Sequence, residues 1–121
     1  MAIESLESLR KHLREFAKER DWDQFHTPKN LSMALIAEAA KLVEHFQWVE
    51  GNKSHLLEDK TRRSVEEELA DILIYLVRIS DKLGIDLYEA AERKLAINAH
   101  KYPADKVRGS AKKYTEYEDT P

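Results

Sequence analysis

The apolar residues of this chain recur at helical spacing through long segments that glycine and proline hardly interrupt. Only three Gly and three Pro occur among 121 residues, and 36% of the residues are charged. This composition favours long amphipathic helices over a protein of strands and tight turns. The pattern therefore predicts an all-α fold, most simply one domain with a modest core.

Helical periodicity, together with start and stop signals, predicts four helices. They are expected over about residues 5–20, 28–48, 62–83 and 87–101. Thr27 can cap the second helix, with Pro28 at its first position, where no amide donor is needed. Gly84 is a natural stop for the third helix, and Asp86 can cap the fourth.

We expect residues 1–103 to form a four-helix bundle, and residues 104–121 to be a polar C-terminal tail that is extended or poorly ordered. The segments 28–48 and 62–83 are apolar around much of their circumference. Such helices are too apolar for a small monomer with one core face. The sequence therefore predicts that part of their surface is buried between subunits.

Several classes of protein are disfavoured by composition. The formal net charge of −3 gives no overall attraction to nucleic acid or to an anionic membrane. Cys is absent, which excludes disulfides, thiolate metal sites and a cysteine nucleophile. No glycine-rich phosphate loop, secretory signal or run of about 20 apolar residues is present. We therefore expect a soluble protein of the cytoplasm with no nucleic-acid or membrane partner.

Two acidic positions on helical stretches suggest chemistry. Glu68 and Asp71 are three residues apart and so share one helix face, whereas Glu38 is followed three residues later by Lys41. Carboxylates from two packed helices could converge on a hard cation such as Mg²⁺. A single pair of this kind most often lies on a solvated face. However, Asp71 directly precedes the apolar residues 72–74, where an unpaired carboxylate is costly to bury, so a metal or a basic partner is plausible.

Other polar and aromatic residues share these helical stripes. They are Tyr75 beside Glu68 and Asp71, His45 and Trp48 beside Glu38 and Lys41, and Lys94, Asn98 and Lys101 on the fourth helix. Packed together, the stripes would supply acids for a metal, lysines for phosphate oxygens and aromatic rings for a base. Trp22 and Trp48 fit a core or interface role equally well, and His26 and His45 are more typical of structural histidines. A di-iron site is excluded because no Glu-x-x-His occurs.

The chain resembles the all-α nucleoside triphosphate pyrophosphohydrolases of the MazG type, in the branch that contains the dCTP pyrophosphatases. The resemblance extends over about residues 9–116, in order and at matching spacing. The segments that carry it are Glu19-Arg20-Asp21-Trp22-Asp23-Gln24-Phe25-His26, Pro28-Lys29-Asn30-Leu31, Phe46-Gln47-Trp48, residues 67–77, Ile97-Asn98 with Tyr102-Pro103, and Lys113-Tyr114-Thr115-Glu116.

This resemblance implies cleavage of the α–β phosphoanhydride of a nucleotide, with Mg²⁺ as cofactor and a dimer or dimer-of-dimers tetramer as the assembly. The implied metal ligands, and with them the catalytic residues, are Glu38, Glu68 and Asp71. The implied substrate contacts are Trp22 and Trp48 at the base, Tyr75, Lys94 and Asn98 at sugar or phosphate groups, and more loosely Lys101 and the lysines of the tail.

Two departures from the family pattern matter. Lys41 stands where the family has its second Glu, and Leu13 falls where some relatives place a His that approaches the base. The leading hypothesis is an enzyme that removes unwanted nucleoside triphosphates from the pool, with a possible preference for dCTP-like substrates. The alternatives are a nucleotide-binding homologue whose turnover is impaired by Lys41, and a purely structural helical module.

Overall fold

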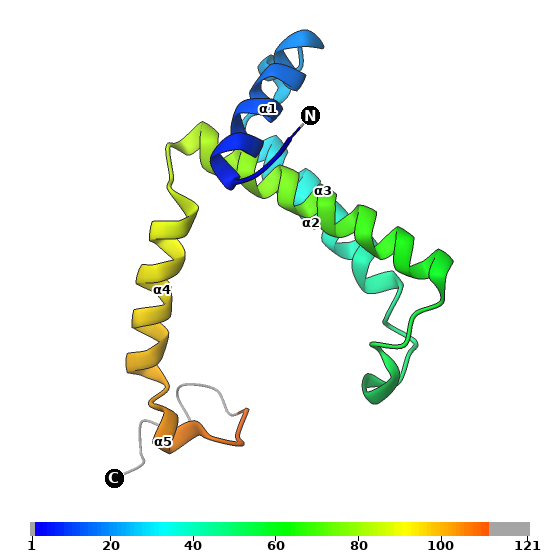
Figure 1. The fold of residues 1–121 in the computed structure, drawn as a ribbon, viewed down its shortest axis with the longest axis vertical. Helices are drawn as coiled ribbons and strands as arrows, with labels where there is room; N and C mark the ends of the chain where they lie inside the picture. Colours follow the sequence, from blue (N-terminus) through cyan, green and yellow to red (C-terminus); the bar gives the residue numbers. More distant parts are fainter. Residues whose placement is uncertain (1, 112–121) are drawn as a thin grey trace. The chain divides into compact units, whose positions relative to one another are not determined.

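The computed structural model describes residues 2–111, and every regular element in that range is helical. The elements are α1 (Leu6–Glu19), η1 (Asp23–Phe25), α2 (Pro28–Glu44), η2 (Gly51–Lys53), α3 (Asp59–Leu83), α4 (Leu87–Lys101) and α5 (Ala104–Val107), where η denotes a single 3₁₀ turn (Figure 1). The all-α prediction is therefore confirmed for this part of the chain. The contacts divide the chain into two compact units, Met1–Ile85 and Asp86–Pro121. A division at residue 103 remains a prediction.

The predicted capping residues lie at the helix ends. The side-chain oxygens of Thr27 and Asp86 each accept a hydrogen bond, at 3.1 Å, from the backbone amide three residues later. Pro28 occupies the first position of α2. Gly84 ends α3 in the left-handed conformation, at φ 66° and ψ 33°, which strains a residue that carries a Cβ.

The second helix is shorter than expected. It ends at Glu44, so the prediction that it continues to Trp48 is wrong. Beyond the end, the amide of Phe46 donates to the carbonyl of Val43 at 2.9 Å, three residues back, and the chain continues in tight turns. Trp48 therefore lies in the connection to α3 and not on the α2 stripe.

Two other boundaries also differ from expectation. The third helix begins at Asp59, three residues before the expected Arg62, after a Glu58 N-cap that makes no side-chain capping hydrogen bond. The predicted tail begins with the short helix α5, whose first turn is closed by the carbonyl of Pro103. The rest of the tail, from residue 112 onward, lies outside the described residues.

The first unit is built around an antiparallel pair of helices, α2 and α3, which lie side by side along most of α2 (Figure 1). Helix α1 packs on α3 and on η1. The apolar core is small, and its buried members are Leu9, Ala17, Leu31, Val65 and Val77.

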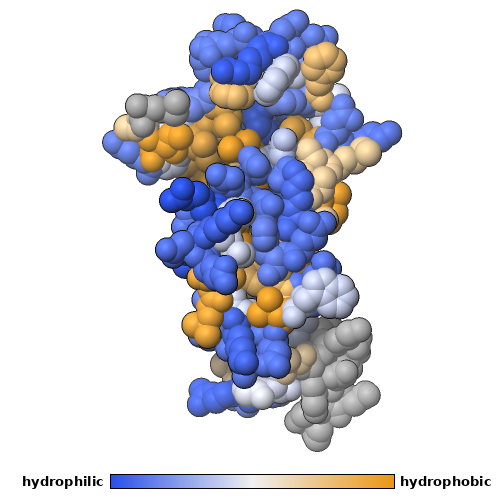
Figure 2. All heavy atoms as spheres, turned by 90° about the vertical axis from the view of Figure 1, so that its right-hand side faces the viewer, coloured by the Kyte–Doolittle hydropathy of each residue, from blue (hydrophilic) through white to orange (hydrophobic). Residues whose placement is uncertain are grey.

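Many large apolar side chains remain exposed on the α2–α3 pair. They are Met33, Ile36 and Val43 on α2, and Leu69, Leu73 and Leu76 on α3. Figure 2 shows apolar residues gathered in patches on the molecular surface. Exposed apolar area of this kind marks interaction surfaces in soluble proteins. Within residues 2–111, no helix is both long and apolar enough to cross a bilayer.

Candidate functional site

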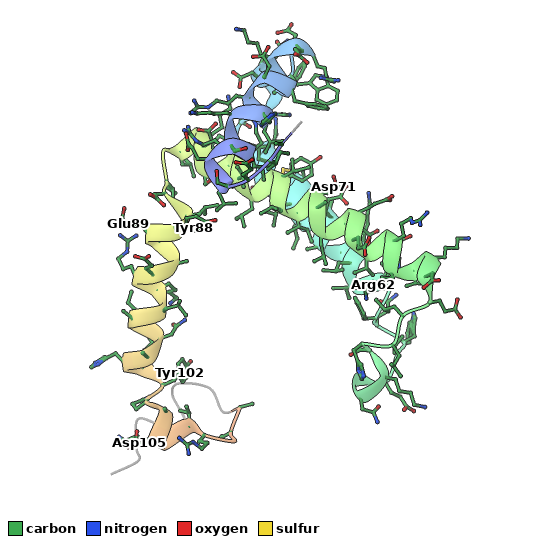
Figure 3. The ribbon with its side chains drawn as sticks, viewed as in Figure 1. Arg62, Asp71, Tyr88, Glu89, Tyr102 and Asp105 are labelled. Carbon is green, nitrogen blue, oxygen red and sulfur yellow. The ribbon has the colours of Figure 1, made fainter. Side chains whose placement is uncertain are left out.

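The predicted acidic positions meet where α2 packs on α3. Glu38 lies on α2, whereas Glu68 and Asp71 lie on α3, and all three are partly buried. His45, at the end of α2, places its Nε2 atom 2.8 Å from the Oε2 atom of Glu68. Asp71 lies in the middle part of α3 (Figure 3). The packing thus brings the predicted stripes of the two helices together.

Lys41 lies within this group of carboxylates. Its Nζ atom donates to Glu38 Oε1 at 3.2 Å. This hydrogen bond is the largest influence that raises the pKa of Lys41, and the negative charges of Glu38, Glu68 and Asp71 raise it further. The side chain is 57% exposed, so the ion pair adds little to stability. Its consequence is electrostatic, because a permanent positive charge lies beside the acids that a metal would need.

The donor set suits a hard cation, although the present side-chain positions do not form a metal site. Among residues 2–111, no group of three or more His, Asp and Glu side chains is placed to hold a metal ion. However, Glu68 Oε2 is a buried oxygen that makes no hydrogen bond, although the Nε2 atom of His45 lies 2.8 Å from it. A buried carboxylate oxygen in this state needs a cation or a donor. Three carboxylates on facing helices therefore fit Mg²⁺ in chemistry, with Lys41 as the opposing charge.

The two tryptophans occupy different environments. Trp22, at the start of η1, is 45% exposed and meets the ring of Phe16 edge-on, with 5.8 Å between the ring centroids. Its other neighbour is the ring of His26, at 6.4 Å. Trp48 is 87% exposed in the connection after α2. Both rings are thus accessible to a ligand, and their role at a base remains a prediction.

The other predicted substrate contacts are distributed over both units. Tyr75 lies on α3, one helical turn beyond Asp71, and is partly buried. Lys94, Asn98 and Lys101 lie on α4, in the second unit. Their contribution to a site with the carboxylates remains a prediction, as does that of the tail lysines from residue 112 onward.

An ion-pair network in the first unit was not predicted from the sequence. Asp81 accepts hydrogen bonds from Arg14, at 2.6 and 2.7 Å, and from Arg10 at 3.1 Å. The buried Arg78 lies one turn before Asp81 on α3. The signal was present in the sequence, because charged residues at positions 78 and 81 continue the apolar stripe of α3 and had to be paired if buried.

The network reaches the segment before α2 and lines a cleft of about 420 Å³ between α1 and α3. Its lining residues are Arg14, Lys18, Asp23, Arg78, Asp81 and Lys82. Asp23 accepts hydrogen bonds from Lys82 at 2.5 Å and from Arg78 at 3.0 Å. These two donors lower the pKa of Asp23, and Arg14 is the main cause of the lowered pKa of Asp81. Asp23 and Asp81 therefore stay charged, and their ion pairs connect η1 and α1 with α3.

This network predicts a stability profile with two acid-sensitive steps. Burial, followed by the charge of Arg78, lowers the pKa of His26 from its ordinary value of 6.5. The unfolded state then binds a proton before the folded state does, so the free energy of unfolding is expected to fall as the pH drops below 6.5. Asp23 and Asp81, with lowered pKa values, should add a second loss below their ordinary value of 3.8.

Urea unfolding measured at half-unit steps from pH 7.5 to pH 3 would check this profile. His26→Gln should remove the first step, whereas His55→Gln, a change in an exposed histidine, should retain it. An equally steep first step in His26→Gln would contradict the assignment.

The regular elements of residues 2–111 are all helical, and carboxylates lie on two helices that pack together. Comparison with known proteins identifies the class to which such a protein belongs. The model of the MazG-like family matches residues 34–117. This chain therefore belongs to the MazG-like family.

The relatives are more specific. The chain is 44% identical over 114 residues to dCTP pyrophosphatase 1 of Homo sapiens, and 43% identical to dCTP pyrophosphatase 1 of Mus musculus. Each match covers 93% of this chain and 67% of the relative. A crystal structure of a pyrophosphatase from Archaeoglobus fulgidus matches with a TM-score of 0.77 and 39% identity, covering 85% of this chain and 96% of that one. The resemblance to the pyrophosphohydrolases, in the dCTP pyrophosphatase branch, is confirmed.

Proposed function

We propose that this protein is a Mg²⁺-dependent nucleoside triphosphate pyrophosphohydrolase that converts (d)NTP to (d)NMP and pyrophosphate, with dCTP-like nucleotides among its substrates. One observation carries the proposal. Glu68 faces α2 and has a buried carboxylate oxygen that makes no hydrogen bond. The chain that carries it is 43–44% identical to proteins named dCTP pyrophosphatase 1. Removal of unwanted nucleotides from the cytoplasmic pool is the proposed task.

The proposed site assigns a role to each group of residues. Glu38, Glu68 and Asp71 would hold the ion, which when bound offsets the charge of the phosphates and lowers the pKa of an attacking water. The rings of Trp22 and Trp48 would stack on or enclose the base, an interaction worth roughly 1–3 kcal/mol per base. The remaining substrate contacts would be Tyr75, Lys94, Asn98 and Lys101. A covalent intermediate is not required, since carboxylates and cations suffice for attack by water.

A second candidate function is supported by the ion pair between Lys41 and Glu38. A lysine in this position neutralises one acid and can reach a phosphate oxygen, so the chain could bind nucleotides and hydrolyse them slowly. This nucleotide-binding alternative differs from the enzyme in turnover and not in binding.

A panel of nucleotides separates these functions. Each of the deoxynucleoside and ribonucleoside triphosphates would be incubated with the protein and Mg²⁺, with EDTA as the control, while pyrophosphate and monophosphate are quantified. The enzyme is expected to release both products in equal amounts, fastest with dCTP-like substrates. Saturable binding without release would favour the binding protein. Neither binding nor release with any nucleotide would leave only the structural module.

The exposed apolar residues of α2 and α3 lead us to propose that the chain assembles as a homodimer, or as a tetramer of two dimers. Light scattering at micromolar concentration is expected to give a mass of two or four chains, where one chain has a mass of 14.1 kDa. Leu73→Glu, at an exposed position on α3, should lower that mass, while Lys60→Glu near the start of α3 should not. A mass of one chain for the unaltered protein would contradict the proposal.

A further inference from the structure

Arg78 is a buried arginine whose hydrogen bonds leave its own helix. It lies on α3, and only 3% of its surface is exposed. A guanidinium at this depth is costly to bury unless its donors are paired. Its Nη2 atom donates to Asp23 Oδ1 at 3.0 Å, and its Nε atom donates to His26 Nδ1 at 3.3 Å. Both acceptors belong to the segment 21–26 between α1 and α2.

The opposite side of Arg78 is also constrained. Its Nη1 atom lies 3.7 Å from Oδ2 of Asp81, which in turn accepts hydrogen bonds from Arg10 and Arg14 on α1. Asp81 is itself nearly buried. The guanidinium of Arg78 is therefore paired with Asp81 through Nη1, while its Nε and Nη2 atoms donate to the segment 21–26.

Trp22 belongs to the segment that Arg78 contacts. It directly precedes Asp23, and its indole ring is bounded by the rings of Phe16 and His26. Asp21, just before it, has a φ of 53°, the left-handed conformation that commonly ends an α-helix, and the amides of Asp21 and Trp22 donate to carbonyls in the last turn of α1. These backbone hydrogen bonds fix the start of the segment at α1, and Arg78 binds the rest of it at both Asp23 and His26.

We propose that Arg78 is a positioning residue that fixes the conformation of the segment 21–26 and thereby the orientation of the Trp22 ring. Any effect on nucleotide recognition rests on the proposed role of Trp22 at the base. Lys82 assists, because its Nζ atom donates to the same Asp23 oxygen at 2.5 Å. A lysine at position 78 could reach one acceptor but lacks the planar fork that serves both.

The test begins in the absence of nucleotide. Trp48→Phe leaves Trp22 as the only tryptophan of the chain. In that background, Arg78→Met keeps the length and apolar stem of the side chain and removes its donors, whereas Arg62→Met changes an exposed arginine of the same helix. Acrylamide quenching and fluorescence anisotropy of Trp22 would be compared at a temperature where circular dichroism shows all variants folded.

Arg78→Met is expected to raise the quenching constant of Trp22 at least twofold and to lower its anisotropy. Arg78→Lys should restore part of the difference, and Arg62→Met should match the parent. A purely stabilising arginine would lower the melting temperature without changing Trp22 in the folded protein. Unchanged quenching and anisotropy in folded Arg78→Met would overturn the proposal. If Arg78→Met does not fold, Asp23→Ala gives the same test, since the Asp23 side chain is 63% exposed.

A second measurement separates this inference from the proposed function. With Trp48 retained, Arg78→Met is expected to raise KM for the preferred nucleotide at least tenfold while kcat changes less than threefold. Altered Trp22 fluorescence with an unchanged KM would support the positioning role and contradict the place of Trp22 at the base. Unaltered fluorescence with a raised KM would overturn the positioning role.

Discussion

Asp71→Asn and Glu68→Gln are each expected to reduce Mg²⁺-dependent pyrophosphate release at least a hundredfold, about 2.7 kcal/mol in the activation barrier. Each substitution keeps the shape of the side chain and removes the negative charge that a hard cation requires. Glu68→Gln also changes the contact with His45, whose Nε2 atom lies 2.8 Å from Glu68 Oε2. The measurement is the initial rate as a function of Mg²⁺ concentration, with circular dichroism to verify helix content.

Glu66→Gln is the matched control, since Glu66 lies on the same helix but is exposed and pairs only weakly with Arg62. It should leave the rate and the Mg²⁺ dependence unchanged. If Asp71→Asn and Glu68→Gln both retained the Mg²⁺ dependence of the parent, the carboxylate site would be refuted.

Lys41→Glu is expected to strengthen Mg²⁺ binding and to raise pyrophosphate release at least tenfold, about 1.4 kcal/mol in the barrier. A protonated lysine has three donors and no acceptor, so it cannot act as a ligand. Its hydrogen bond to Glu38 and its attraction to Glu68 and Asp71 oppose the entry of a second cation. The substitution removes this competitor and adds a fourth carboxylate.

Two further variants resolve how Lys41 acts. Lys41→Gln removes the charge without adding a ligand, so it should give only part of the gain in Mg²⁺ binding and pyrophosphate release. Lys29→Glu is the control, because it introduces the same acid on α2 away from the site. Isothermal titration with Mg²⁺ and the pyrophosphate assay would be applied to each variant. If the unaltered chain were as fast as Lys41→Glu, residue 41 would lie outside the metal site.

The acidic positions illustrate what a pattern of residues can predict. The spacing of Glu68 and Asp71 on a helix, and of Glu38 and Lys41 on another, indicated two faces that should meet. The contact between His45 and Glu68 confirms that they do. By contrast, the roles of Lys94 and Asn98 depend on where α4 lies relative to the carboxylates, which helical spacing within one element does not determine.

Helix boundaries were predictable where a local signal exists. The side chains of Thr27 and Asp86 accept backbone hydrogen bonds at the starts of α2 and α4, and Gly84 ends α3 in a left-handed conformation. Each of these residues lies at the helix end that the sequence predicted. The end of α2 at Glu44 and the start of α3 at Asp59 carry no such signal. The residues after Glu44 are compatible with helix, and Glu58 provides no side-chain cap, so local sequence did not predict these two boundaries.

The sequence by itself determined the helical class, the capped ends and the existence of two acidic faces, because these depend on residues within a few positions of one another. Only the tertiary structure decided which charges pair. Arg78 meets Asp23 and His26 across 55 and 52 residues, and Arg14 meets Asp81 across 67. The partner of a buried charge is whichever acceptor the packing brings within about 3 Å, and sequence spacing along a single helix contains no information about that distance.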